Sequence, residues 1–425
     1  MKKLSLSLTL TAISLLLPYG CDQLSSTITY TTNEPVYLSY LEFRSTKAAQ
    51  PAKEMVHPGK ICLYGNYLFI NEIAEGIHII DNTNPSAPKS IAFIELIGNL
   101  DLTVNNNILY ADSFIDLVLF DVTNPAQPVE CGRVDNVFPN VLPATGNTYP
   151  IRNVDWNKGV VIGWEVKTIT EKEEFQLFYP CPNCGYLDLA SSSSWAIQES
   201  SPLSPSLTGI TGSMSRFAVY GDYLYVVNNG LLTVFSLYGN AAIKGQEQYL
   251  SWNVETIFPY NNMLFLGTTS GMMIYGLTNP SAPNYLSSIS HIVGCDPVVV
   301  QGDYAYVTIR GGNTCGQNLS LLEVIDISNP SAPVLRASYN MSQPYGLGID
   351  GNTLFVCDQG LTIFDATNPI IVGAKMIMKV PSINGFDVIP YNGILILIGS
   401  DGLYLYDYSD INNIKEMSAI KVSKN

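Results

Sequence analysis

Residues 76–88 read Gly-Ile-His-Ile-Ile-Asp-Asn-Thr-Asn-Pro-Ser-Ala-Pro, an apolar run followed directly by Asp, Asn and Pro. The apolar run favours a short strand, and the Asp, Asn and Pro residues favour a tight turn after it. Similar phrases end at residues 125, 283, 333 and 369, and a last one at Asp407 lacks the proline. The stretch is therefore one copy of an internal repeat, and the repeat decides the fold.

A hairpin turn precedes each phrase, at about residues 65, 106, 157, 221, 261, 302, 351 and 392. Spacings of roughly 40–50 residues are typical of propeller blades. The second unit shows four strand signals, at 100–104, 108–112, 117–122 and 129–134, and strands this short need stacked neighbours. We predict an all-β propeller with four-stranded antiparallel blades. Eight turns indicate eight blades; seven is the alternative, because the copies at 157 and 221 depart from the pattern.

The phrases Ile-Ile-Asp, Leu-Phe-Asp and Val-Ile-Asp, each followed after one residue by Ser/Thr-Asn-Pro, resemble the LVIVD repeat of bacterial surface and periplasmic propeller proteins. The resemblance covers about residues 35–425, and Glu34-Pro35-Val36-Tyr37 with Pro58-Gly59-Lys60 is typical of the lipoprotein branch. It implies a propeller fold and supplies no catalytic residue to carry onto this chain. The Asp and Asn of each phrase are interpreted as turn formers that bond nearby backbone.

The N-terminal residues predict export. Lys2 and Lys3 precede an apolar run at 4–17 that is too short to span a bilayer. Gly20-Cys21 resembles the lipobox of bacterial lipoproteins, which implies lipidation of Cys21; an ordinary secretory signal is the alternative. We expect a signal peptide at 1–20, a tether at 21–34, an N-terminal arm at 35–58 and the propeller at 59–425. The expected location is the bacterial cell envelope, lipid-anchored to a membrane on its periplasmic or outer-surface side.

Composition excludes several partners. Hydrophobic residues make up 47% of the chain, enough for a packed core, and 21 Lys+Arg against 36 Asp+Glu give a net charge of −15. Nucleic-acid binding requires a basic surface that neutralises phosphates, and the sequence has no basic run. We therefore expect no nucleic-acid partner, and we expect a monomer whose membrane contact is through the N-terminal lipid.

The cysteines divide into two groups. Cys181 and Cys184 form a CxxC inside one large insertion, at about 167–213, and are predicted to form a local disulfide; half of a zinc site and free thiols are the alternatives. Cys295 and Cys315 flank one hairpin and are predicted to form a second disulfide. Three others, Cys62, Cys131 and Cys357, are expected to be buried in strands. No metal site and no cofactor are expected.

The sequence offers little for catalysis. It contains three histidines, and His78 alternates with Ile77 and Ile79, which predicts a solvated side chain. No nucleophile elbow, zinc-protease motif or phosphate loop is present. Carboxylates distant in sequence could still meet in space, as glycosidases require.

A candidate ligand site lies at one mouth of the predicted channel. The positions five residues before each turn are Lys60, Asp101, Arg152, Arg216, Thr256, Pro297, Gly346 and Asp387, and a shift of one adds Asp296 and Tyr345. From these we predict a ligand-binding ring of Lys60, Asp101, Arg152, Arg216, Asp296, Tyr345 and Asp387; the alternative is a solvated mouth held by ion pairs. The predicted function is a non-enzymatic protein- or glycan-binding module. One alternative is an envelope enzyme acting on a polysaccharide through carboxylates in the channel or insertion cleft, and another is a purely structural envelope component.

Overall fold

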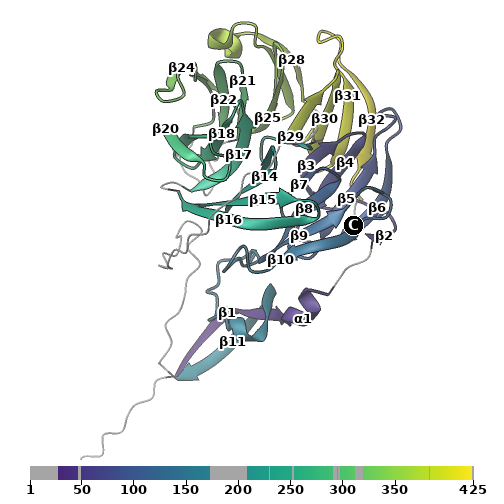
Figure 1. The fold of residues 1–425 in the computed structure, drawn as a ribbon, viewed down its shortest axis with the longest axis vertical. Coiled ribbons are helices and arrows are strands. Elements are labelled where there is room, and N and C mark those ends of the chain that lie inside the picture. Colours follow the sequence, from purple (N-terminus) through teal and green to yellow (C-terminus); the bar gives the residue numbers. More distant parts are fainter. Residues whose placement is uncertain are drawn as a thin grey trace, which may run out of the picture.

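The computed structural model describes residues 27–45, 49–172, 208–228, 230–250, 253–290, 294, 297–311, 319–381 and 383–423. Seven antiparallel sheets, each built on four consecutive strands, surround a central axis (Figure 1). The β-propeller is therefore confirmed, with its four-stranded blades. The expectation of eight blades is wrong, and the alternative of seven is correct.

The blades follow one another along the chain. Blade 1 consists of β3 (Pro58–Tyr64), β4 (Tyr67–Glu72), β5 (Gly76–Asp81) and β6 (Lys89–Glu95); blade 2 of β7 (Leu102–Asn105), β8 (Ile108–Ser113), β9 (Asp116–Asp121) and β10 (Val129–Val134). Blade 3 consists of β13 (Phe217–Tyr220), β14 (Tyr223–Asn228), β15 (Leu231–Tyr238) and β16 (Ala241–Tyr249); blade 4 of β17 (Val254–Tyr260), β18 (Met263–Thr268), β19 (Gly271–Gly276) and β20 (Asn284–Ser290). Blade 5 consists of β21 (Val298–Gln301), β22 (Tyr304–Ile309), β23 (Leu321–Asp326) and β24 (Val334–Asn340); blade 6 of β25 (Pro344–Asp350), β26 (Thr353–Asp358), β27 (Leu361–Asp365) and β28 (Met376–Val380). Blade 7 consists of β29 (Gly385–Tyr391), β30 (Ile394–Gly399), β31 (Gly402–Asp407) and β32 (Lys415–Lys421).

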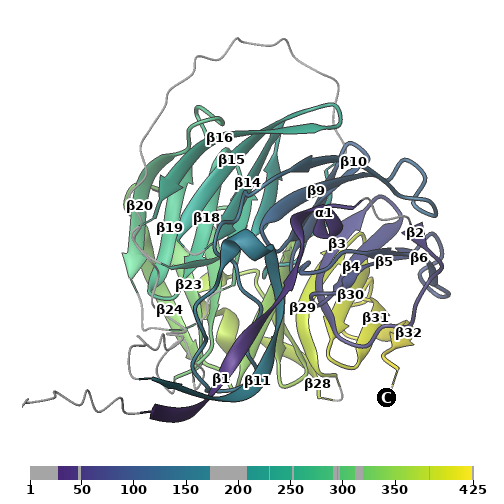
Figure 2. The same cartoon turned by 90° about the horizontal axis from the view of Figure 1, so that it is seen from below.

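The repeat copy at residue 157 forms a separate ribbon. Its strand β11 (Val160–Lys172) pairs antiparallel with β1 (Thr27–Leu38). One end of this ribbon packs against Phe114 and Ile115 of blade 2, and the other end projects beyond the blades (Figures 1 and 2). Residues 27–34, expected in the tether, thus form most of β1. This copy does not form a blade, because its strand β11 pairs with the N-terminal strand β1 instead of with a strand that follows it in the chain. Two short strands extend blade 1: β2 (Ala49–Gln50) on its outer edge and β12 (Ile210–Thr211) on its inner edge.

A short helix joins the ribbon to the propeller. Helix α1 (Tyr40–Phe43) is followed by Arg44, whose guanidinium donates to both oxygens of the buried Asp116 at 2.8 and 3.0 Å. Arg133 and the backbone N–H of Asn136 also face this carboxylate, at 3.3 and 2.8 Å. Two 3-10 turns, Trp156–Lys158 and Pro369–Ala374, complete the helical elements of the described ranges, where no helix is long and apolar enough to cross a bilayer.

The repeated phrase forms the same turn in blades 1, 2, 5, 6 and 7. Asp81 accepts a hydrogen bond from the Thr83 N–H at 2.9 Å, and Asn84 accepts one from the Ser86 N–H at 3.2 Å. The same Asp contact recurs at Asp121, Asp326, Asp365 and Asp407. Hydrogen bonds from Ser328 and Arg336 lower the pKa of Asp326 to about 2. The interpretation of the phrase as turn chemistry is confirmed.

These turns also connect neighbouring blades. The Tyr225 hydroxyl of blade 3 donates to the Pro280 carbonyl of blade 4 at 2.8 Å, and Ser287 of blade 4 donates to Pro330 of blade 5 at 2.5 Å. Ser418 of blade 7 donates to Pro85 of blade 1 at 2.6 Å. The proline carbonyl of the phrase is thus an acceptor for the preceding blade, and the last of these bonds closes the ring.

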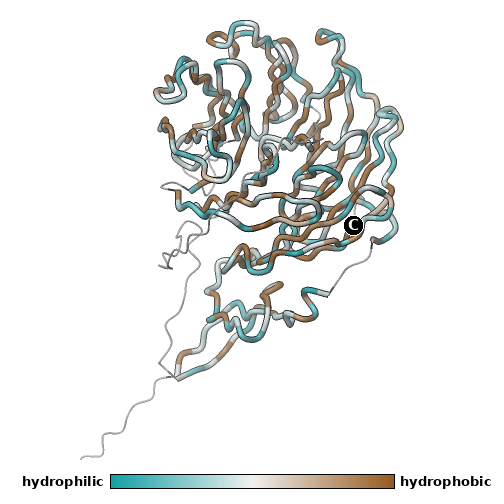
Figure 3. Tube along the Cα trace, in the orientation of Figure 1, coloured by the Kyte–Doolittle hydropathy of each residue, from teal (hydrophilic) through white to brown (hydrophobic). Residues whose placement is uncertain are grey.

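Apolar packing between blade faces forms the core. Ile61, Leu68 and Ile70 of blade 1 pack against Ile396 and Leu403 of blade 7, so the ring closes without a shared strand. The hydrophobic stretches follow the strands of the blades (Figure 3). Both faces of a typical strand are therefore covered by neighbouring blades.

Three of the cysteines lie in described strands. Cys62 in β3 and Cys357 in β26 are buried free thiols, as expected, and burial raises both pKa values, that of Cys62 to about 12. Cys131 in β10 is partly buried. The predicted lipidation at Cys21 and the predicted disulfides of Cys181, Cys184, Cys295 and Cys315 lie outside the described residues.

Candidate functional site

The predicted ring positions lie where the inner strands begin. Lys60, Thr256, Gly346 and Asp387 fall in β3, β17, β25 and β29, while Asp101, Arg216 and Pro297 directly precede β7, β13 and β21. The five-residue spacing therefore identified one position in every blade.

One predicted site residue, Arg152, lies away from this ring in the described structure. Arg152 lies beside the ribbon, where it pairs with Glu34 at 2.5 Å and Glu171 at 2.7 Å. Its placement in the ring was wrong because its repeat copy is not a blade. Tyr345, in β25, has the Arg310 guanidinium 4.1 Å from its ring centroid. Asp296 lies outside the described residues.

Residues 208–216, here called the channel segment, run along the axis of the propeller. Gly209 N–H donates to the Val104 carbonyl at 2.7 Å, β12 pairs with β3 at Leu63 and Cys62, and Gly212 N–H donates to Ile61 at 3.2 Å. A side chain would not fit at two of its positions: a Cβ on Gly209 would collide with the Cys62 Sγ, and one on Gly212 with the Asp387 carboxylate. The segment thus adds to the inner edge of blade 1 in close contact with the ring.

Asp387 holds the middle of the channel segment. It is buried and accepts hydrogen bonds from the Ser213 N–H at 3.1 Å, the Ser213 hydroxyl at 3.0 Å and the Met214 N–H at 3.3 Å. The Lys60 ammonium donates to the Met214 carbonyl. Burial raises the pKa of Asp387 to about 6, against the opposing effect of Lys60, and burial lowers the pKa of Lys60.

Two further carboxylates, Asp101 and Asp112, bind the C-terminal end of the channel segment. Asp101 accepts from the Ser215 hydroxyl at 3.1 Å and from the Arg216 N–H at 2.6 Å. The Arg216 guanidinium donates to Asp112 at 2.7 Å, and burial raises the pKa of the Asp112 carboxyl. The other Asp112 oxygen accepts from the backbone N–H groups of Leu100 and Asp101 at 2.6 and 2.9 Å. The sequence analysis missed Asp112, Ser213 and Ser215; the signal available was the unusual polarity of Asp112-Ser113 at the end of an apolar strand.

These hydrogen bonds fix the channel segment to the inner strands of the blades. Every carboxylate oxygen of Asp101, Asp112 and Asp387 has a donor from the same chain within hydrogen-bonding distance. The segment also bonds blade 4, where Ile257 N–H donates to Ser215, and blade 6, where Leu347 N–H donates to Ser213. All three carboxylates therefore take part in hydrogen bonds within the chain.

A buried histidine lies in blade 1. His78 is fully buried, and its Nε2 lies 2.8 Å from a Glu72 oxygen, so the prediction of a solvated side chain was wrong. The alternation rule failed because neighbouring blades cover both faces of the strand. Burial lowers the pKa of His78, and Glu72 also accepts from the Val56 N–H at 3.0 Å. Within the described ranges, no group of three or more His, Cys, Asp or Glu side chains is placed to hold a metal ion.

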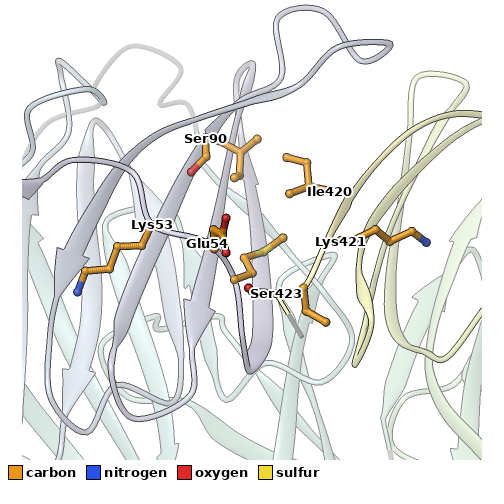
Figure 4. Close-up of a pocket in the computed structure, with 9 residues that line it drawn as sticks. Lys53, Glu54, Ser90, Ile420, Lys421 and Ser423 are labelled. Atoms are coloured by element: carbon orange, nitrogen blue, oxygen red, sulfur yellow. The ribbon is translucent and has the colours of Figure 1, made fainter. Parts of the chain in front are cut away.

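A cavity of about 390 Å³ lies at the seam between blades 1 and 7 (Figure 4). Met55, Ile80, Ile420 and Val422 form its apolar lining. The two lysines at its rim point away from it, because their ammonium groups lie over aromatic rings: Lys53 over Phe93 at 4.3 Å and Lys421 over Tyr404 at 3.8 Å. The cavity therefore offers no converging positive charge, and the channel stays the stronger candidate site.

The fold and this locked channel define a seven-bladed β-propeller closed by an internal segment. The chain carries LVIVD repeats: the LVIVD repeat family matches residues 58–92, 100–136, 211–234 and 295–341. These matches fall on blades 1, 2, 3 and 5, and the third begins inside the channel segment.

Several solved structures are similar to this chain at low sequence identity. A protein from Bacteroides uniformis ATCC 8492, described as a candidate 6-phosphogluconolactonase, is 10% identical with a TM-score of 0.51, over 89% of this chain and 97% of that one. PorZ of Porphyromonas gingivalis is 10% identical with a TM-score of 0.49, over 89% of this chain and 40% of that one. Hsv2 of Kluyveromyces lactis is 11% identical with a TM-score of 0.47, over 84% and 98%. No match was found among curated proteins.

Proposed function

We propose that this propeller is a non-enzymatic module that binds a protein or a glycan at the bacterial cell envelope. One observation carries the proposal: each carboxylate of the candidate site accepts hydrogen bonds from the channel segment, which lies against it. The groups that remain available to a partner lie on blade edges and loops, a common location for binding surfaces on rigid scaffolds.

Sequence features support the envelope location. Lys2, Lys3 and the apolar run at 4–17 have the form of a signal peptide, and Cys21 follows a small residue as in a lipobox. Lipidation is tested by growing cells with an alkyne fatty acid and tagging the protein. We expect labelling of the wild type and its loss in Cys21→Ser; an equally labelled Cys21→Ser would contradict the anchor.

Site-specific photocrosslinking tests the binding role. A photoreactive residue is placed, one at a time, at exposed outer-strand positions and at one buried control. The exposed positions are Val129, Tyr249, Tyr285 and Met376, and the control is Phe265. We expect a discrete adduct in the native envelope from a cluster of exposed positions and none from Phe265. Absence of adducts from a full set of exposed positions would count against the proposal.

The second candidate is an envelope enzyme acting on a polysaccharide. The raised pKa values of Asp387 and Asp112 favour it, because perturbed carboxyls are frequent in active sites. Such an enzyme would require the channel segment to leave its carboxylates. The discriminating measurement is reducing-end release from envelope polysaccharides by the wild type and Asp387→Asn. We expect no release from either; release by the wild type that Asp387→Asn abolishes would favour the enzyme.

A further inference from the structure

The ribbon of β1 and β11 has one open edge. In the part of the chain that the structure describes, β11 pairs with no strand except β1. The outer edge of β1 is partly covered, because Asn33 bonds residues 150–152. β11 has 13 residues and contains no proline, and a long unpaired edge of this kind is a template for pairing with another chain.

The backbone orientation of β11 follows from Asn33. Asn33 N–H donates to the Pro150 carbonyl at 2.8 Å, and the Asn33 carbonyl accepts from Arg152 N–H at 3.0 Å. These groups point away from β11, so Asn33 and its partner Val166 form a non-hydrogen-bonded pair of the ribbon. The N–H and C=O of Val166 therefore point to the open edge, as do those of Trp164 and Thr168 two residues away.

The side chains around Val166 are exposed and self-complementary in charge. Val166 is 50% exposed. Glu165 and Lys167, on either side of it, share the opposite face of the strand and are paired with each other at 2.7 Å, with side chains 61% and 49% exposed. An antiparallel pairing centred on Val166 would place each Glu165 opposite the Lys167 of the other strand.

We propose that β11 pairs antiparallel with β11 of a second copy of this chain, on a two-fold axis at Val166. The two Val166 residues would exchange backbone hydrogen bonds, and a four-stranded sheet β1-β11-β11-β1 would join the two ribbons. Glu165 and Lys167 would then meet twice as directly opposed, non-hydrogen-bonded pairs, where side chains approach most closely. The backbone bonds hold the copies together and the charges set the register.

The ribbon contacts blade 2 at its Leu38 and Val160 end and projects beyond the blades at its other end (Figure 1), which leaves room for this assembly. The proposal differs from the expectation of a monomer made from the sequence. It is independent of the proposed binding function, since it uses none of the channel or outer-strand residues.

A charge exchange across the two-fold axis tests the proposal. Glu165→Lys would oppose lysine to Lys167 of the other copy, and Lys167→Glu would oppose glutamate to Glu165. Each single variant, alone, should associate about tenfold more weakly or worse than the wild type, since opposed like charges are unfavourable. The double exchange Glu165→Lys with Lys167→Glu restores opposite charges and should restore association.

The two single variants mixed in equal amounts provide the sharpest arm, because each pairs favourably only with the other. Sedimentation velocity of the purified full chain across the micromolar range measures all forms. Circular dichroism confirms that each variant is folded. We expect wild-type dimers, weakened single variants, and dimers again in the mixture and the double exchange. A wild type that stays monomeric, single variants that associate normally, or a mixture that fails to recover would each overturn the proposal.

Discussion

Replacement of Asp387 by alanine should release the channel segment. This carboxylate is the acceptor for the Ser213 and Met214 N–H groups and for the Ser213 hydroxyl, at 3.0–3.3 Å. Its removal leaves these donors facing an apolar methyl group inside the ring. In this variant Lys60 still has Asp101 as a nearby opposite charge, so the substitution mainly affects the hydrogen bonds of the channel segment.

The expected loss follows from the donors left unpaired. Each buried donor without an acceptor costs about 1–3 kcal/mol. The losses are not additive for neighbours, and removal of a buried carboxyl relieves its own desolvation cost, which is the reason for its raised pKa. We therefore expect Asp387→Ala to lower the free energy of unfolding by about 2–4 kcal/mol.

Two measurements check this expectation. Denaturant unfolding at neutral pH gives the free energy of unfolding, and native-state hydrogen exchange reports the amides of Gly212, Ser213 and Met214 individually. Asp407→Ala, at the exposed turn of blade 7, is the matched control, because it removes one carboxylate whose hydrogen bonds are local to the turn, with Ser409. The reasoning is refuted if the loss is below about 1 kcal/mol, or if these three amides exchange no faster than those of the inner strands.

The remaining predictions concern the arm, pH and the links between blades. Arg44→Met should lower the free energy of unfolding by about 3 kcal/mol, because the buried Asp116 keeps only Arg133, which lies farther away, as a cationic partner. Thermal unfolding measures the loss, and an unchanged midpoint would contradict the prediction. As pH falls from roughly 7.5 to 5, the wild type should gain stability relative to Asp387→Asn, because a carboxyl with a native pKa of about 6 and an unfolded value of 3.8 binds its proton first in the folded state; a parallel pH dependence in denaturant titrations would exclude this. Tyr225→Phe should cost about 1 kcal/mol through the lost bond to Pro280, and a double-mutant cycle with a blade 4 turn variant checks that it acts across the blade boundary.

The blades were predictable because their signals are local. The apolar arms, the Asp and Asn turn formers and the proline lie within one repeat, and the structure shows the expected turn at Asp81 and Asn84. The copy at 157 carries only part of this signal, a turn followed by an apolar arm at 160–162, and lacks the Asp, Asn and Pro of the phrase. Its partner is β1, far away in the chain, and no local pattern reveals a pairing between distant segments. The prediction of eight blades was therefore wrong at the one copy whose strand pairs with a segment distant in sequence.

The sequence predicted where the candidate site lies, but it did not predict that the channel segment lies against it. Counting back from each turn placed Lys60, Asp101, Arg216 and Asp387 at the axis, because inner strands begin at equivalent points. The channel segment holds only a two-residue strand, β12, which leaves no periodic pattern. His78 was misjudged for a related reason: alternation separates two strand faces but says nothing of what covers each.

Each blade of this ring is built from one uninterrupted stretch of sequence, and the circle closes through side chains of blades 1 and 7 and the Ser418–Pro85 bond. A gene duplication or deletion that adds or removes one whole repeat would therefore leave every remaining sheet complete. A change in copy number would therefore break no hairpin, and only the contacts between the blades at the joint would have to be remade.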